Sequence, residues 1–298
     1  MQSDPVGRKA AVEDGPAAFA SPEQIPALTS LWLTAFPEDQ PVEIARFFQT
    51  VFRPERCLVS TVDGRPASMA FLLPAVLETG RGAFSLQYIY AAATLPDFRG
   101  QGMFGRLLRR AQELGRDQGL VASFLRPAEA GLAQYYERFG YRPFFRAVDE
   151  RIFVDPSGEP VSLRPVSPAR YASLREGALS GTTAWVRWPE ELTAYAAESA
   201  RRVGGEVIGA GGGCALCEPQ GTTLFIREWL PAPGIQGERA LRRAVSSRFP
   251  LSEWTRRRPA REGETAAPFG WLCPLTEDAA RVFDRLRDRN PYMGLAFD

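Results

Sequence analysis

The segment that most limits how this chain can fold is a loop with three glycines between an apolar strand and an amphipathic helix. Residues 88–94 have the pattern of a strand, Pro96 turns the chain, and Gly100, Gly102 and Gly105 lead into the helix. The first turn of a helix leaves backbone N–H groups without partners and carries a partial positive charge. Glycines there let a phosphate approach the backbone closely. The segment therefore predicts an anion site suited to a pyrophosphate.

A glycine-rich helix start occurs in several kinds of protein. An ordinary tight turn has the same composition, so the loop alone does not identify a phosphate site. A P-loop is excluded because no Gly-Lys-Ser/Thr follows. A dinucleotide-binding Rossmann loop is excluded because several helices and strands are predicted before Gly100, and no acidic residue ends a strand at the required distance. Arg99 adds a full positive charge beside the glycines.

A second segment makes the assignment more specific. Residues 99–104 read Arg-Gly-Gln-Gly-Met-Phe, and residues 136–141, after a predicted strand at 120–125, read Tyr-Glu-Arg-Phe-Gly-Tyr. At this spacing the two motifs resemble those of the GNAT superfamily of N-acetyltransferases, over about residues 21–150. The resemblance implies a GNAT fold that binds acetyl-CoA as a co-substrate.

By this resemblance, the backbone N–H groups of the loop hold the pyrophosphate of acetyl-CoA. The end of the preceding strand pairs with the pantetheine arm as an added strand does, and one of its N–H groups polarises the thioester carbonyl. Three consecutive alanines suit a narrow tunnel wall, although tight packing of the strand against a helix would also favour them. The implied donor-binding residues are Ala92, Ala93, Thr94, Arg99, Gly100, Gln101, Gly102, Met103, Phe104 and Gly105.

The resemblance also implies a catalytic residue. Tyr136 matches the family tyrosine that protonates the departing CoA thiolate, and the adjacent Tyr135 is a competing candidate. A purely packing role is the alternative for Tyr136. Two positions depart from the family pattern. Phe104 stands where Gly or Ala is usual, and Arg126 follows the next strand where many members place an Asn that contacts CoA.

The order of predicted elements indicates a mixed α/β (α+β) chain of two domains. Residues 1–20 are expected to be a disordered tail, and Ser21 has the features of a helix N-cap. Residues 21–152 are expected to form a GNAT domain with a mixed, mostly antiparallel sheet. Residues 153–298 alternate helices with strands but lack the glycine loop, so we expect a second, degenerate GNAT-like α/β domain. This layout resembles that of the aminoglycoside-modifying Eis-like acetyltransferases.

In Eis-like enzymes the chain's own C-terminal carboxylate can enter the first domain's active site. The tail here, residues 290–298, is apolar, which is unusual for a chain end. One hypothesis is that this tail docks near the cleft and that Asp298 supplies a carboxylate for the amine. The alternative is that the tail completes a strand of the second domain.

Composition excludes several chemistries. The chain has 298 residues and no histidine, so it contains neither a Ser–His nor a Cys–His catalytic pair and no His-ligated zinc. Cys214 and Cys217 fall in a predicted strand with opposite side-chain directions, which favours structural cysteines and no metal site. The net charge of +1 predicts no nucleic-acid or membrane partner. Residues 256–258, three arginines, are interpreted as an exposed charge run in a strand or loop and not as a nucleic-acid patch. No leader or spanning segment is apparent, so a cytoplasmic location is expected.

The predicted function is an acetyl-CoA-dependent N-acetyltransferase, a transferase that moves an acetyl group to a primary amine by direct attack. The acceptor is a small-molecule or peptide amine that the sequence does not identify further, and the oligomeric state stays open. The alternative is a non-catalytic acyl-CoA-binding regulatory module in which Tyr136 is idle.

Overall fold

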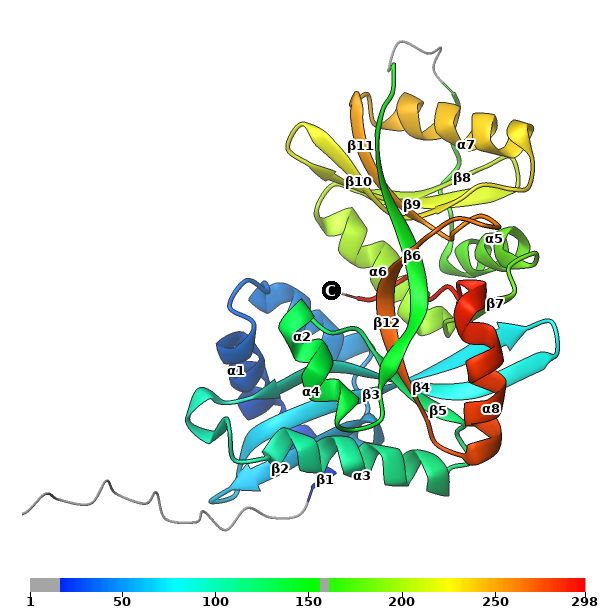
Figure 1. Ribbon diagram of the computed structural model, residues 1–298. Helices are drawn as coiled ribbons and strands as arrows, with labels where there is room; N and C mark the ends of the chain where they lie inside the picture. Colours follow the sequence, from blue (N-terminus) through cyan, green and yellow to red (C-terminus); the bar gives the residue numbers. More distant parts are fainter. Residues whose placement is uncertain (1–16, 156–160, 298) are drawn as a thin grey trace, which may run out of the picture.

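One continuous twelve-stranded sheet runs through the residues that the computed structural model describes, 17–155 and 161–297 (Figure 1). Its strands are β1 (Ala18–Phe19), β2 (Cys57–Val62), β3 (Arg65–Thr79), β4 (Gly82–Thr94), β5 (Ala122–Leu125), β6 (Arg142–Phe153), β7 (Ala184–Arg187), β8 (Glu206–Ala210), β9 (Gly213–Gln220), β10 (Thr223–Leu230), β11 (Glu253–Arg258) and β12 (Ala267–Pro274). Their order is β1-β2-β3-β4-β5-β12-β6-β11-β10-β9-β8, and β7 pairs with β3 beside this path.

Strand pairing is parallel for β4 with β5 and for β10 with β11, and antiparallel for the other named pairs. The prediction of a mixed, mostly antiparallel α/β fold is therefore confirmed. The strand β6 is the long central element in Figure 1, and it passes from the lower part of the molecule to the upper part. The strands that flank it, β12 and β11, continue the sheet into both parts.

The helices cover the sheet in both parts. They are α1 (Ile25–Ala35), α2 (Pro41–Thr50), α3 (Met103–Asp117), α4 (Ala133–Glu137), α5 (Pro168–Leu179), α6 (Glu190–Arg202), α7 (Ile235–Arg248) and α8 (Glu277–Leu286). The predicted N-cap, Ser21, begins a short 3-10 helix, Pro22–Gln24, that leads directly into α1: Ser21 N–H donates to the Gln24 side chain, and Pro22 is in the first turn. Of the predicted tail, residues 1–16 lie outside the described residues, and Ala18–Phe19 form β1, which pairs with β2.

The two faces of β3 and β4 bury different helices. On one face, the rings of Trp32 from α1 and Phe47 from α2 pack against Phe71 and Tyr90, with centroids 4.8–5.7 Å apart. On the other face, Leu107 and its neighbours in α3 join a separate cluster with residues from β2 to β5. Alternation along the strands sends consecutive residues to opposite faces, which is why both clusters form. This packing holds the start of α3 beside the end of β4.

The sequence did not indicate β7, and it did not distinguish a strand from a loop at β11. The first has only four residues, too few to show a period. In β11, alternate residues Trp254, Arg256 and Arg258 point inward. Because two of them are charged, the sequence does not show the apolar–polar alternation of a strand. The interpretation of residues 256–258 as an exposed charge run is wrong for Arg256 and Arg258, which are 3% and 6% exposed. Both bind the Glu150 side chain on β6.

A structural pattern recurs in the two parts of the sheet. The helix α3 connects the parallel strands β4 and β5, and α7 connects the parallel strands β10 and β11. The last paired residues are Ile89 with Leu125 in the first pair and Ile226 with Arg256 in the second. Just after these residues, the pairing of β4 with β3 and the pairing of β10 with β9 each shift in register. Such bulges bend a strand and separate it from its neighbour.

The C-terminal segment, residues 291–297, is buried along nearly its whole length. Tyr292 N–H donates to Ala184 O, and Val186 N–H donates to Tyr292 O. Among the described residues, the segment's strand pairing is one isolated bridge, between Tyr292 and Trp185 of β7. The tail passes between the two parts, and its end lies near the centre of the molecule (Figure 1).

Candidate functional site

The loop after β4 has the backbone geometry that its glycines allow. A short 3-10 turn, Pro96–Phe98, follows the strand, and the chain then takes left-handed conformations at Gly100 and Gly102, with φ of 77° and 76°. Residues with a Cβ rarely adopt such angles. Gly102 is the N-cap of α3, so the predicted glycine-rich helix start is present.

The loop forms one wall of a cavity of about 630 Å³. The cavity brings together every predicted donor-binding residue except Gln101, together with Tyr136. Gln101 is exposed, and its side-chain amide donates to Asp97 O at 3.0 Å. The cavity is lined by Ala35, Phe36, Ala92, Ala93, Thr94, Phe98, Arg99, Gly100, Gly102, Met103, Phe104, Gly105, Arg109, Leu132, Tyr135, Tyr136, Arg138 and Phe139.

The potential in this cavity favours an anion. The first turn of α3 directs unpaired N–H groups toward it, and Arg99, Arg109 and Arg138 line it. Two of these guanidiniums lie over aromatic rings that also line the cavity, Arg109 over Phe139 at 5.1 Å and Arg138 over Tyr135 at 5.3 Å. These contacts hold the charges at the cavity wall.

The end of β4 offers a free strand edge to the same cavity. Its pairing with β5 stops at Ile89, and Ala91 adopts a φ of +43°, which marks the bulge. Ala92, Ala93 and Thr94 then line the cavity without a β5 partner. An extended chain can add to such an edge through backbone hydrogen bonds.

Tyr136, in α4, is 8% exposed and lies on the cavity wall. Burial raises the pKa of its phenol well above the usual value, and the neighbouring Tyr135 adds to the shift. The phenol therefore keeps its proton at neutral pH and is available as a proton donor. Tyr135 lines the cavity too, and burial also raises its pKa.

The aromatic residue at position 104 is accommodated by its neighbours. The Phe104 ring stacks on Tyr135, with centroids 6.0 Å apart, and meets the Tyr136 ring edge-on at 6.1 Å. The small residue required here is Gly105 instead. A Cβ at this position would lie 2.8 Å from Phe139 Cζ, too close for two carbon atoms.

Several cavity residues had no sequence signal. Ala35 and Phe36 come from the end of α1 and its C-cap, and Leu132 comes from the turn before α4. These contributions depend on how distant elements pack, which a single sequence does not reveal. Asp298 lies outside the described residues. Its predecessors reach β4, since Tyr88 OH donates to Ala296 O at 3.0 Å and Tyr90 OH donates to Phe297 O at 2.8 Å.

The cysteines are placed as predicted. Cys214 and Cys217 in β9 are buried in two different core clusters, on opposite faces of the sheet. The described part of the chain has no cluster of three or more His, Cys, Asp or Glu side chains that could hold a metal ion. Within residues 17–155 and 161–297, no helix is long and apolar enough to cross a membrane.

Comparison with known proteins finds a matching family model and solved structures with a similar fold. Residues 18–144 match the family described as "Acetyltransferase (GNAT) domain". No curated protein sequence matches the chain. Among solved structures, a probable N-acyltransferase from Enterococcus faecalis V583 is similar, with a TM-score of 0.68 and 13% identity over 89% of this chain and 73% of the other.

Two further solved structures are similar over most of their length. Eis1 from Mycobacterium abscessus has a TM-score of 0.66 and 18% identity, over 89% of this chain and 75% of its own. A GCN5-related N-acetyltransferase from Kribbella flavida has a TM-score of 0.67 and 17% identity, over 90% and 71%. At these identities the likeness shows a shared fold across both parts of the chain.

Proposed function

We propose that this chain, whose residues 18–144 match the GNAT acetyltransferase domain family, transfers an acetyl group from acetyl-CoA to the primary amine of an acceptor. The observation that carries the proposal is the single cavity that joins the glycine loop, the free edge of β4 and Tyr136. In this proposal residues 21–152 form the catalytic domain, and residues 153–298 form a second domain that encloses the acceptor side.

Each wall of the cavity has a part in binding the donor. The loop N–H groups and Arg99 hold the pyrophosphate, because a helix start with glycines accepts phosphate oxygens closely. The β4 edge at residues 92–94 pairs with the pantetheine amides. A backbone N–H at this edge polarises the thioester carbonyl and stabilises the negative charge that develops on its oxygen.

The transfer needs two proton movements. The amine nitrogen bonds to the carbonyl carbon, the carbon–sulfur bond breaks, and the sulfur leaves with the electron pair of that bond. Tyr136 donates its phenolic proton to this sulfur. The nitrogen loses a proton to a carboxylate, for which we propose Asp298. The support is that Phe297, the preceding residue, is hydrogen-bonded to Tyr90 on β4.

Two measurements test this proposal. Isothermal titration of the purified chain with acetyl-CoA is expected to show saturable binding near one per chain. With an amine panel as acceptors, Tyr136→Phe is expected to lower kcat by about a hundredfold, the low end of what a general acid contributes. The Kd for acetyl-CoA should stay unchanged, because the hydroxyl acts on the departing sulfur and not on the bound donor.

Tyr135→Phe is the matched control, since it removes a hydroxyl from the neighbouring ring in the same cavity. It is expected to leave kcat within about threefold. A loss of kcat in this variant and not in Tyr136→Phe would reverse the assignment. Acetyl-CoA binding without turnover of any amine would favour the non-catalytic acyl-CoA-binding module instead.

The role of Asp298 has a separate test. We expect Asp298→Asn to lower turnover by about tenfold or more at neutral pH, the loss typical of removing a weak general base, with the melting temperature retained. Unchanged turnover in a folded protein would contradict a role for this side chain.

A further inference from the structure

A second, smaller cavity of about 160 Å³ is bordered by three arginines. Arg126 follows β5, Arg227 lies in β10 and Arg257 lies in β11, so both parts of the sheet contribute. The other lining residues are Phe225 and the tail segment 294–296. Arg126, which stands where many GNAT members place a CoA-contacting Asn, thus borders this cavity and does not line the donor cavity.

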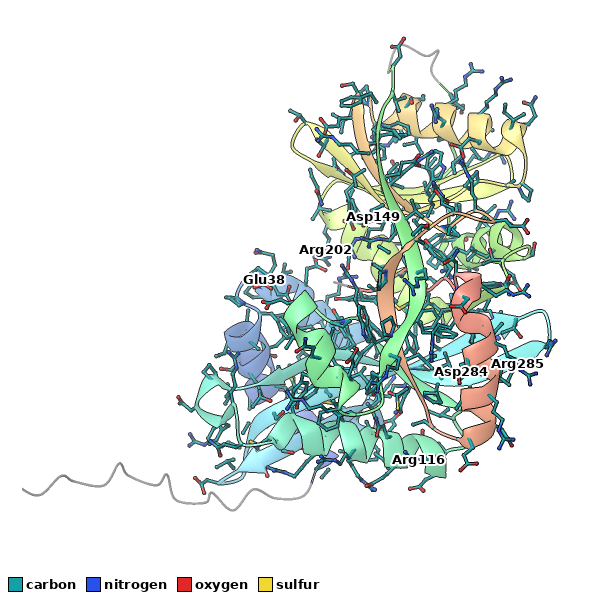
Figure 2. All side chains as sticks on the ribbon, viewed as in Figure 1. Glu38, Arg116, Asp149, Arg202, Asp284 and Arg285 are labelled. Carbon is teal, nitrogen blue, oxygen red and sulfur yellow. The ribbon has the colours of Figure 1, made fainter. Side chains whose placement is uncertain are left out.

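Aromatic rings and carboxylates fix the guanidiniums in place. The Phe269 ring lies under both Arg126 and Arg257, at 4.7 and 4.3 Å from the guanidinium carbons. Asp149 accepts two hydrogen bonds of 2.8 Å from Arg257. This carboxylate is half exposed on β6, where the strand passes between the two parts of the molecule (Figure 2). Asp149 does not line the cavity, so the guanidinium of this pair, and not the carboxylate, borders it.

Arg227 is held less completely. Its Nε lies 2.8 Å from Glu218 Oε1, yet this buried nitrogen makes no hydrogen bond of acceptable geometry among the described residues. The residue is at the bulge of β10, where the pairing with β9 shifts between Ile226 and Glu228. Bulges often redirect a side chain at functional sites.

The cavity lies where both parallel strand pairs separate. Arg126 comes directly after Leu125, the last β5 residue paired with β4, and Arg257 comes directly after Arg256, the last β11 residue paired with β10. In the lower part this separation opens the donor cavity. In the upper part the corresponding separation places Arg227 and Arg257 on the lining of the smaller cavity.

Two of the three arginines have a carboxylate beside them, Arg257 with Asp149 and Arg227 with Glu218, and three guanidiniums together still favour an anion in this half-buried place. Burial lowers the pKa of Arg126, and the nearby Arg257 lowers it further. A guanidinium fork matches a planar carboxylate and can bind it through two parallel hydrogen bonds. The small volume suits one such group and not a long chain.

The tail connects this cavity to the donor site. Its backbone at residues 294–296 borders the arginines, and the carbonyls of Ala296 and Phe297 accept hydrogen bonds from Tyr88 and Tyr90 of β4. Ala92, two residues after Tyr90, lines the donor cavity. The tail therefore contacts both the arginine cavity and the strand whose end lines the donor cavity.

We propose that the cavity bordered by Arg126, Arg227 and Arg257 binds a carboxylate of the acceptor, so that the acceptor is an amine that also carries a carboxylate. This inference rests on the proposed acetyl transfer. A polycationic acceptor, such as an aminoglycoside, meets three guanidiniums here and is disfavoured.

The test compares amines with and without the carboxylate. Alanine is paired with ethylamine and lysine with cadaverine, and release of the CoA thiol is followed with acetyl-CoA as donor. We expect turnover with the carboxylate-bearing amines. For their decarboxylated partners, we expect kcat/KM to be at least tenfold lower. Arg257→Gln should raise the KM for the carboxylate-bearing amines by about tenfold to a hundredfold with little change in kcat, because a charged hydrogen bond distant from the reacting atoms is lost equally before and in the transition state.

Arg257→Lys should recover part of the loss, since it keeps the charge without the fork. The control is Arg285→Gln, which removes an exposed positive charge on α8 (Figure 2) and should leave KM unchanged. Equal use of the decarboxylated amines, or an unchanged KM in Arg257→Gln, would overturn the inference. So would a lack of turnover in both series while other amines are acetylated. Failure of the proposed function itself would show separately, as absent acetyl-CoA binding in the wild type or as binding without turnover of any amine.

Discussion

Replacing Glu228 by alanine is expected to lower the free energy of unfolding by about 3–5 kcal/mol, the usual cost of leaving one member of a buried ion pair without its partner. The Glu228 carboxylate is 0% exposed and its partner Arg175 is 2% exposed. Two hydrogen bonds of 2.7 and 2.8 Å join them, and Tyr171 OH donates a third to the carboxylate at 2.7 Å. The melting temperature should fall by on the order of 10 °C.

The physical reason is the buried guanidinium. Burial alone would lower the pKa of Arg175, but the Glu228 charge and its hydrogen bonds outweigh burial and keep the pKa above its usual value. Without Glu228 the guanidinium stays charged and loses its counter-charge. The C-terminal segment is in direct contact with the substituted side chain, because Gly294 packs so closely on Glu228 that a Cβ on Gly294 would collide with Glu228 Oε1. The ion pair is thus packed against the backbone of the segment that leads to β4.

The matched control is the double variant Arg175→Met with Glu228→Met, assayed by thermal and urea unfolding. Removing both charges leaves no uncompensated ion, so the double variant should be clearly more stable than Glu228→Ala. Limited proteolysis should cut the C-terminal segment faster in Glu228→Ala than in the double variant. If Glu228→Ala melts within about 2 °C of wild type, which is under 1 kcal/mol, the ion pair does not hold the tail.

The donor side of the site could be predicted because its signals are local in sequence. Gly100 and Gly102 need left-handed backbone, and Tyr136 follows in a fixed register with Gly140 and Tyr141, so neighbouring residues carry the pattern. The predicted residues do line one cavity, apart from Gln101. Their binding and catalytic roles stay predictions.

The acceptor side could not be predicted, because it forms only when distant strands meet. Arg126, Arg227 and Arg257 are far apart in sequence: the first two stand next to apolar residues and the third lies in a run of three arginines. Sequence patterns identify inward-facing positions by their apolar residues. The inward positions of β11 are occupied by arginines, so this strand was interpreted as an exposed charge run. Glu228 and Arg175 were missed for the same reason. Their charges are typical of surface residues until the fold pairs them.

The last prediction concerns the helix start itself: Gly102→Glu is expected to weaken acetyl-CoA binding by a hundredfold or more. Gly102 lines the donor cavity, and Arg106 Nη1 is the nearest atom to a Cβ there, at 3.5 Å, so the new side chain fits without a severe clash. Its carboxylate would stand where the phosphates must bind and would compete for the same N–H groups. A full negative charge facing a pyrophosphate at the mouth of a half-buried cavity is repulsive by several kcal/mol at the effective dielectric of such sites.

Gly119→Glu separates this effect from backbone strain. Gly119 follows the other end of α3 with a φ of +73°, close to the 76° of Gly102, and a Cβ there meets no atom within 4 Å. Both variants therefore introduce the same residue into the same strained conformation, about 1 kcal/mol each, and both should lower the melting temperature similarly. Titration calorimetry should then show normal acetyl-CoA binding in Gly119→Glu and binding weakened by a hundredfold or more in Gly102→Glu. Equal affinity in the two variants would mean that the phosphates bind elsewhere, because only the position of the charge differs between them.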